Sequence, residues 1–221
     1  MTTAKVAVFY NHTDASEYLA NVVLKARHTM RLKAPDKPGQ YAQQIERAYF
    51  EHGVAEFALP MFWEIAMSKN SVKLSTELAV LVSHLPVKLI APLSNTTLEE
   101  IVSKLRTRKN FAGSCEHWQS DAPAESCGMC VPCLHRYLIL KKLGKPTEEI
   151  FLEDPINGHD GKIRLYQLLT TISNPKHVMT RMEITIATLI ADCFIKDIFP
   201  LDVSDIMEKR FNKFLHAWSA E

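Results

Sequence analysis

The residues best suited to specific chemistry are four cysteines, Cys115, Cys127, Cys130 and Cys133, in the middle of the 221-residue chain. The last three form two overlapping Cys-x2-Cys steps. A tight turn between such cysteines brings their sulfur atoms to neighbouring corners of a tetrahedron, and a fourth sulfur from across a polar loop completes the shell. Four thiolates leave no open position for water, so this spacing predicts a structural Zn²⁺ site.

Other uses of these residues stay open at this stage. Overlapping Cys-x2-Cys steps also occur in iron–sulfur proteins, but those runs usually continue with a nearby fourth cysteine, and here none follows before Cys193. The cysteines could instead form two disulfides. His117 and His135 flank the loop and could replace a cysteine as ligands. Cys193 lies in an apolar helical stretch, and we expect it to be a small core residue.

Composition and charge exclude several classes of protein. With 26 basic and 25 acidic residues the net charge is +1, so the whole molecule is not an electrostatic binder of nucleic acid or of anionic membranes. No apolar run approaches the roughly 18 residues that span a bilayer, and the polar residues 1–5 lack the apolar region of a signal peptide. We therefore expect a cytoplasmic protein that does not contact membranes. Clustered cysteines in that reducing compartment bind metal more often than they form disulfides.

Glycine is scarce. The chain has 7 glycines, and none precedes Gly39. A loop that lays its backbone against the phosphates of a nucleotide needs glycine, because a Cβ atom prevents such a close approach. A glycine-rich phosphate loop near the N-terminus is therefore excluded.

The elements around the cysteines alternate between strands and helices. Apolar and β-branched runs predict strands at residues 5–10 and 87–91. Helical spacing and capping residues predict helices at about 14–25, 41–52, 72–84, 96–105, 134–143, 164–173, 181–199 and 203–218. The basic stretch 25–37 is expected to be an exposed connection. This order favours an α/β fold with a parallel sheet, flanking helices, a zinc-binding loop and an all-helical C-terminal appendage.

We expect two parts in the chain. Residues 1–145 would form the α/β domain, including the zinc loop at 114–136, and residues 146–221 the helical extension. Four basic residues lie directly before the zinc loop: Lys104, Arg106, Arg108 and Lys109. Such a cluster can contact phosphates of nucleic acid, although helix ends attract basic residues through the helix dipole as well. A zinc-stabilised nucleic-acid-binding module is therefore one candidate function.

A wider pattern surrounds the cysteines. Its positions are Ser114, Cys115, Cys127, Gly128, Cys130, Cys133, Arg136, Leu143 and Gly144, together with Pro92-Leu93 and Glu100-Ile101-Val102 upstream. This pattern resembles the zinc-binding end of the 7-cyano-7-deazaguanine synthase family of the queuosine pathway. Residues 127–134 are most similar to longer synthase-like proteins of bacterial anti-phage defence cassettes. The resemblance covers about residues 72–155.

The resemblance implies an adenine-nucleotide hydrolase-like fold and the chemistry of the ATP pyrophosphatase group. Enzymes of that family adenylate a carboxylate with ATP and Mg²⁺ and then couple it to ammonia, so the implied activity is a C–N ligase acting on a deazapurine-type, nucleobase-like substrate.

The chain departs from that family at two positions of the nucleotide site. The family has a Ser-Gly-Gly-x-Asp-Ser loop after its first strand, where residues 9–15 match only at Asp14. Leu98 stands where the family has a lysine, and losing that cation removes charge stabilisation of the leaving pyrophosphate. Both changes affect the reaction rather than the fold. The sequence thus leaves open an enzyme, part of a split enzyme, or an impaired homologue that binds a partner protein in a defence or modification system.

Overall fold

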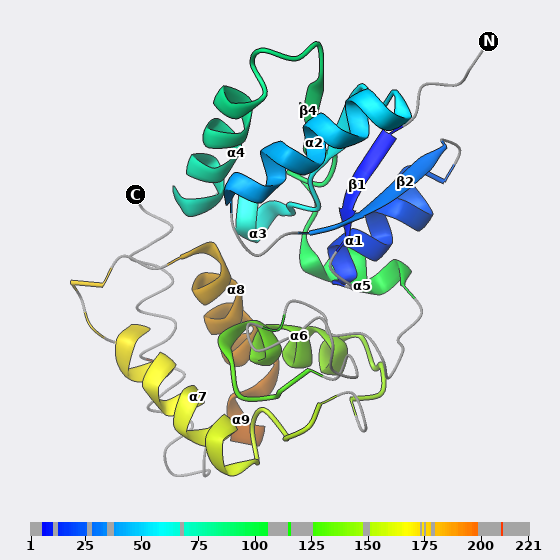
Figure 1. Ribbon diagram of the computed structural model, residues 1–221. Coiled ribbons are helices and arrows are strands. Elements are labelled where there is room, and N and C mark those ends of the chain that lie inside the picture. Colours follow the sequence, from blue (N-terminus) through cyan, green and yellow to red (C-terminus); the bar gives the residue numbers. More distant parts are fainter. Residues whose placement is uncertain are drawn as a thin grey trace. The chain divides into compact units, whose positions relative to one another are not determined.

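The structure is a computed structural model of the 221-residue chain. It describes residues 6–10, 13–25, 28–34, 38–66, 69–105, 115, 126–147, 151–172, 174, 176–177, 180–198 and 209. The chain divides into two compact units, Met1–Arg106 and Thr107–Glu221, whose elements Figure 1 labels. This division differs from the expected boundary at residue 145. It places the cysteine loop with the C-terminal helices, because the helix that follows the loop packs against them.

The first unit contains a sheet of four parallel strands in the order β2-β1-β3-β4. The strands are β1 (Val6–Tyr10), β2 (Thr29–Lys33), β3 (Glu56–Ala58) and β4 (Lys88–Ile90). All five side chains of β1 are buried, as the continuous apolar run of a central parallel strand requires. The α/β class with a parallel sheet is therefore confirmed.

Helices cover both faces of this sheet (Figure 1). They are α1 (Asp14–Tyr18) with its π-helical continuation η1 (Leu19–Val23), α2 (Pro38–His52), α3 (Trp63–Ala66), α4 (Lys69–Leu81) and α5 (Leu98–Lys104). Side chains of α2 and α4 pack with Phe9 and Phe57 on one face, and α1 contacts both β1 and α5. The chain reverses direction across the sheet after β2, so α1 lies on one face and α2 and α4 share the other.

Strand β2 corrects one expectation from the sequence. The stretch 25–37 was expected to be an exposed connection, but Thr29–Lys33 pairs in register with β1. Met30 and Leu32 pack against the core, whereas Arg31 and Lys33 are exposed. Only two apolar residues alternate with the charges in this short strand, so the period-2 signal is weak.

Glu64 is a buried acid that connects α3 to the start of α5. Its side chain is 4 % exposed, and its two carboxylate oxygens lie 3.3 and 3.2 Å from the backbone nitrogen of Leu98, which donates a hydrogen bond. Burial is the largest influence on this carboxyl group and raises the pKa of Glu64 above its ordinary value of 4.5.

This pKa makes a prediction about stability and pH. Because the folded protein holds the Glu64 proton more tightly than the unfolded chain, its contribution is fully present below about pH 4.5 and is lost as pH rises through the raised pKa. Glu64→Gln removes this pH-dependent loss of stability, because glutamine does not ionise. We expect the stability of the variant relative to wild type to increase between about pH 4.5 and neutral pH, measured by denaturant unfolding.

The control is Glu77→Gln, since Glu77 forms an exposed pair with Lys73 at 3.7 Å. Its stability relative to wild type should change little over the same range, because exposed pairs contribute about 0–1 kcal/mol. A difference between Glu64→Gln and wild type that stays constant with pH would contradict the expectation.

The second unit is helical around the cysteine loop. Its helices are α6 (Val131–Lys142), α7 (His159–Ile172) and α8 (Arg181–Leu189), the last continuing through the π-helical η2 (Ile190–Phe194) into α9 (Ile195–Ile198). Helix α6 contacts both α7 and α8. The helices expected at 134–143, 164–173 and 181–199 are confirmed within the described residues, although α7 begins earlier. The helix expected at 203–218 lies outside them, apart from the single residue Lys209.

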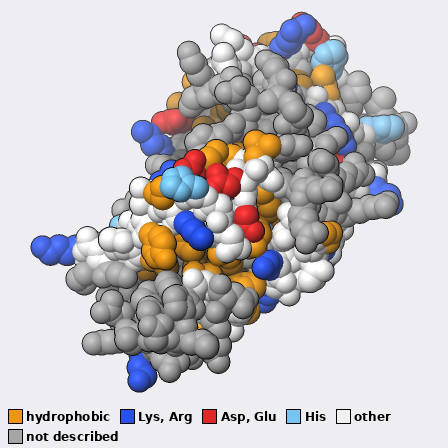
Figure 2. Space-filling model, turned by 90° about the horizontal axis from the view of Figure 1, so that it is seen from below, with side chains coloured by type: hydrophobic (Ala, Val, Ile, Leu, Met, Phe, Trp, Pro, Cys, Tyr) orange, Lys and Arg blue, Asp and Glu red, His pale blue; other side chains and the backbone are white. Residues whose placement is uncertain are grey.

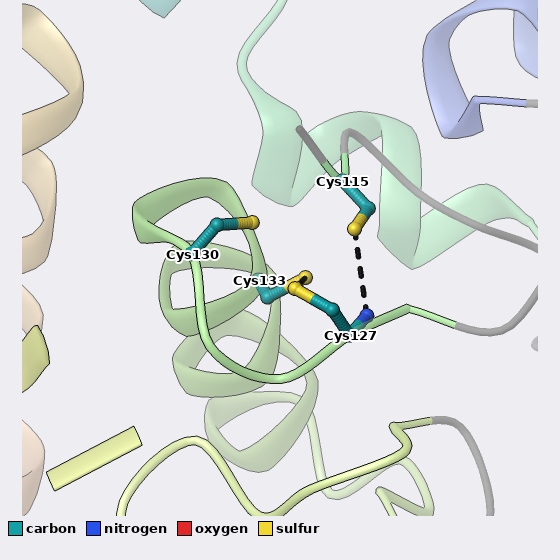
Figure 3. A group of neighbouring side chains, drawn as sticks. All are labelled: Cys115, Cys127, Cys130 and Cys133. Atoms are coloured by element: carbon teal, nitrogen blue, oxygen red, sulfur yellow. Dashed lines mark hydrogen bonds between the residues drawn. The ribbon is translucent and has the colours of Figure 1, made fainter. Parts of the chain in front are cut away.

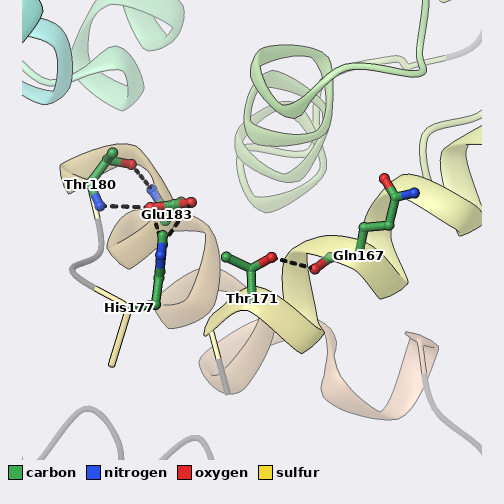
Figure 4. A network of polar contacts seen from close by, with 5 residues as sticks. All are labelled: Gln167, Thr171, His177, Thr180 and Glu183. Carbon is green, nitrogen blue, oxygen red and sulfur yellow. Dashed lines mark hydrogen bonds and ion pairs between the residues drawn. The ribbon is translucent and has the colours of Figure 1, made fainter. Parts of the chain in front are cut away.

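The start of α8 is fixed by a local polar network, shown in Figure 4. The side chain of Thr180 accepts a hydrogen bond from the backbone of Glu183 at 3.2 Å, and the Glu183 carboxylate accepts one from the backbone of Thr180 at 2.7 Å. His177 adds a contact with that carboxylate at 3.3 Å. This reciprocal arrangement is a capping box, which satisfies two donors that a helix start leaves free.

The described surface carries scattered apolar side chains between polar ones, as the face in Figure 2 shows. In the second unit Leu152, Ile163 and Tyr166 are exposed. Cys193 is also exposed, so its expected place in the core is wrong. The buried stripe of this helix passes through Ile190 and Phe194, and Cys193 lies beside it. Among the described residues, no helix has the length and apolar character to cross a membrane.

Candidate metal centre

The four cysteines predicted to bind metal lie together in the second unit (Figure 3). The sulfur atoms of Cys115, Cys127, Cys130 and Cys133 are all within 4.8 Å of one another, and those of Cys127 and Cys133 are 3.8 Å apart. Four sulfurs that each lie about 2.3 Å from a tetrahedral zinc ion are separated by about 3.8 Å. The group is therefore close enough to hold one metal ion.

Helix α6 and the turn before it position three of these sulfurs. Cys130 is the N-cap residue of α6, and Cys133 lies in the first turn, after Pro132. Proline suits this position because its fixed φ angle matches a helix start and it lacks an N–H to leave unpaired. Between Cys127 and Cys130 the chain turns at Gly128, whose φ of 80° is in the left-handed region that favours glycine.

Backbone amides point at the sulfur atoms. The N–H of Met129 donates to the sulfur of Cys127 at 3.3 Å, and the N–H of Cys127 donates to the sulfur of Cys115 at 3.4 Å. Hydrogen bonds to a charged form favour that form, so these donors stabilise thiolates. The second bond connects Cys115 to the other cysteines across the intervening loop.

Burial and charge also suit a metal-thiolate site. Cys127, Cys130 and Cys133 are at most 4 % exposed, and Cys115 is half-buried. Contacts with the other three sulfurs, Cys115 first, lower the pKa of Cys127, and contacts with the same group raise the pKa of Cys133. Such neighbouring thiols compete for protons. A metal ion relieves this competition, because it takes the place of the protons on the sulfur atoms.

Arg136 brings a positive charge to the same region. It lies one turn after Cys133 on α6, and the residue is 2 % exposed. Its Nη1 donates to the hydroxyl of the buried Ser126 at 3.4 Å. Four thiolates around a divalent ion carry a net negative charge, which a buried arginine helps to offset.

The predicted histidine alternatives have different outcomes. The structure does not place His135 in the metal-binding group, which among the described residues consists of the four cysteines alone. His117 lies outside the described residues. Nearby, Asp154 accepts hydrogen bonds from the backbone of Ile156 at 2.8 Å and Asn157 at 2.9 Å. It stabilises a turn.

His135 is the most unusual buried polar residue of the second unit. Its side chain is fully buried in α6, and neither ring nitrogen has a hydrogen-bond partner among the described residues. Burial lowers the pKa of His135 to about 3. A buried polar group without a partner costs about 1–3 kcal/mol, because it has lost its bonds to water.

Replacing this ring with an apolar side chain of similar volume should therefore stabilise the protein. We expect His135→Leu to raise the free energy of unfolding by about 1 kcal/mol or more, measured in denaturant. His159→Leu, at an exposed position, is the control and should change stability by less than about 0.5 kcal/mol. A loss of stability in His135→Leu would show that the ring has a polar partner.

The predicted nucleotide position, Asp14, is buried at the start of α1. The N-cap of that helix is Thr13. The hydroxyl of Thr13 accepts from the backbone N–H of Ser16 at 3.2 Å, and the Ser16 hydroxyl accepts from the backbone N–H of Thr13 at 3.1 Å. Two amides that could face a phosphate are therefore occupied within the chain.

Of the four basic residues considered for nucleic acid, only Lys104 is described. Its ammonium group donates to the hydroxyl of Tyr18 at 3.3 Å and lies 5.7 Å from the centre of that ring. Arg106, Arg108 and Lys109 lie outside the described residues. Lys104 thus has a structural partner within the first unit.

One supporting segment was not foreseen from the sequence. Residues Phe151–Asp154, which we call the strap, run beside the cysteine loop. Ser126 forms a parallel bridge with Phe151, and the backbone N–H of Leu152 donates to the Ser126 carbonyl at 2.8 Å. The only sequence signals were Gly128 and Gly158, whose need for close contacts depends on tertiary structure.

Comparisons with protein families, with curated proteins and with solved structures found no match.

Proposed function

We propose that the protein binds one Zn²⁺ in a structural role through Cys115, Cys127, Cys130 and Cys133. The observation that carries this proposal is the size of the sulfur group, in which every pair lies within 4.8 Å. That spacing suits the corners of a tetrahedron around one ion better than a cluster of several irons. Four thiolate ligands saturate zinc, which supports a structural rather than a catalytic role. Reducing conditions in the cytoplasm, the location we propose, keep the thiols available.

Metal analysis of the purified chain tests this proposal. We expect about one equivalent of zinc per chain and four fewer titratable thiols than after denaturation with a chelator. One equivalent of iron with visible absorption, or a chain that takes up no zinc under reducing conditions, would overturn it.

We further propose that the protein is a 7-cyano-7-deazaguanine synthase-like protein whose nucleotide site is impaired. The sequence pattern around the cysteines supports this assignment, and so does a parallel sheet in which the strand order reverses between β1 and β3. Ligands of such α/β sheets bind outside the carboxyl ends of the strands at this reversal. An adenine-nucleotide hydrolase-like sheet is the proposed form of the fold.

The turn after β1 favours a role in binding a ligand other than ATP over a role in ATP turnover. It has no glycine, and the capping contacts between Thr13 and Ser16 use two of its backbone N–H groups. A loop with these groups engaged is poorly suited to wrap a phosphate. The proposed role is therefore to bind a nucleobase-like ligand or a partner protein within a defence or modification system.

ATP turnover distinguishes this role from that of an active ligase. The zinc-loaded protein is incubated with ATP, Mg²⁺, ammonia and a 7-deazaguanine carboxylate, and AMP is measured. We expect no AMP above a no-protein control and no ATP binding by calorimetry. Carboxylate-dependent AMP formation would contradict the impaired site and support the ligase.

A further inference from the structure

The strap Phe151–Asp154 contacts the metal loop through its backbone. Gly128 lies in the turn between two cysteines, and a Cβ atom built there would be 1.8 Å from the carbonyl oxygen of Glu153. The bridge between Ser126 and Phe151 fixes the strap beside the residue that precedes Cys127. The conformation of the cysteine turn and the position of Glu153 are therefore mutually dependent.

The side chain of Glu153 contacts a different element, the start of α7. Its Oε1 accepts a hydrogen bond from the backbone N–H of Asp160 at 2.7 Å and from that of Gly161 at 3.3 Å. These amides belong to the first turn of α7, where a helix has no internal acceptors. A carboxylate there also interacts favourably with the helix dipole.

Gly158 explains why the cap comes from a distant residue. Its carbonyl accepts the first helical hydrogen bond, from the N–H of Lys162 at 3.0 Å, so Gly158 occupies the capping position. Glycine has no side chain with which to cap. A Cβ atom at Gly158 would lie 2.3 Å from Oε1 of Glu153, so the glycine makes room for the carboxylate.

The remaining contacts hold the strap between these two elements. Phe151 packs edge to face against Tyr137 of α6, with ring centres 5.8 Å apart. The carbonyl of Asp154 accepts from the N–H of Gly158 at 2.9 Å. These contacts connect the strap at the metal loop to the residues that precede α7.

We propose that Glu153 is a positioning residue that couples metal binding at the four cysteines to the order of the first turn of α7. With metal bound, the turn at Gly128 is fixed, the strap lies against it, and the Glu153 carboxylate caps α7. Without metal, the strap loses its support and the cap is released. The coupling rests on the proposed zinc site. Its consequence is that metal occupancy controls the order of the first turn of α7, the helix on which Ile163 and Tyr166 are exposed.

Hydrogen–deuterium exchange of the full chain, with zinc measured on the same samples, tests the coupling. In wild type, removal of zinc with a chelator should speed exchange in the first turn of α7 by about fivefold or more, as expected when a helix cap is lost. Zinc-loaded Glu153→Ala should keep about one equivalent of zinc and show the fast exchange of metal-free wild type at α7. Adding more zinc to this variant should not slow the exchange at α7.

Two further variants separate capping from general loosening. Glu153→Gln retains an oxygen acceptor and should restore most of the protection. Glu183→Ala removes the corresponding cap of α8 and should leave the zinc response of α7 unchanged. Two results would overturn the coupling alone. One is wild-type exchange at α7 in zinc-loaded Glu153→Ala. The other is α7 exchange in zinc-bound wild type that does not change when a chelator removes the zinc. Wild type without zinc overturns the proposed metal site as well.

Discussion

Cys130→Ser is expected to lose about one equivalent of zinc and to unfold at much lower denaturant concentration than wild type. Cys130 is fully buried, its sulfur belongs to the metal group, and its backbone is the N-cap of α6. Since metal binding is coupled to folding, the expected loss in unfolding free energy is about 4 kcal/mol or more. Metal analysis and denaturant unfolding measure the two effects.

Cys193→Ser is the matched control for this experiment. Cys193 is the fifth cysteine, lies outside the metal group and is exposed. The same chemical change there should leave the zinc content at one equivalent and alter stability by less than about 0.5 kcal/mol. A Cys130→Ser variant with the zinc content and unfolding midpoint of wild type would exclude a structural metal site.

Gly128→Ala should be nearly as damaging, although it removes no ligand. A left-handed backbone costs a residue with a Cβ about 1 kcal/mol. The added Cβ also meets the carbonyl oxygen of Glu153 at 1.8 Å, so either the cysteine turn or the strap must move. We expect a loss of about 3 kcal/mol or more in unfolding free energy, together with weaker zinc binding in a chelator competition.

Gly144→Ala isolates the effect of the close approach. Gly144 has a similar φ of 62°, but a Cβ atom there meets no described atom within 4 Å. Its substitution should cost only the backbone strain, about 1 kcal/mol, and leave zinc affinity unchanged. Equal effects of the two substitutions would show that contact with the strap is unimportant.

The parts of the structure that could be predicted are those fixed by short stretches of sequence. The four cysteines were predicted as a group because the spacing of Cys127, Cys130 and Cys133 restricts their sulfurs to one turn and one helix start. Strand β1 was predicted because all its side chains are apolar. Two helix ends, near residues 52 and 143, were predicted closely, and each is followed by a glycine with positive φ, Gly53 and Gly144.

The parts that were missed depend on residues far apart in sequence. Strand β2 is recognisable only through its pairing with β1. The burial of His135, whose ring has no hydrogen-bond partner among the described residues, could not be predicted, because a histidine looks the same in sequence whether it is buried or exposed. The early start of α7 was missed because His159-Asp160-Gly161 suggests a turn, and the carboxylate that caps it comes from Glu153.

The glycines around the strap have a consequence for the tolerance of the chain to substitution. An added Cβ atom at Gly128, Gly158 or Gly161 would lie 2.6 Å or less from an atom of the strap. In a saturation scan these three positions should reject every side chain. At Gly128 this should include asparagine, which otherwise accepts left-handed backbone. Gly53 and Gly144 should accept asparagine. The positions that do not tolerate substitution would thus lie along the strap, from the cysteine loop to α7, and none of these three glycines is a metal ligand.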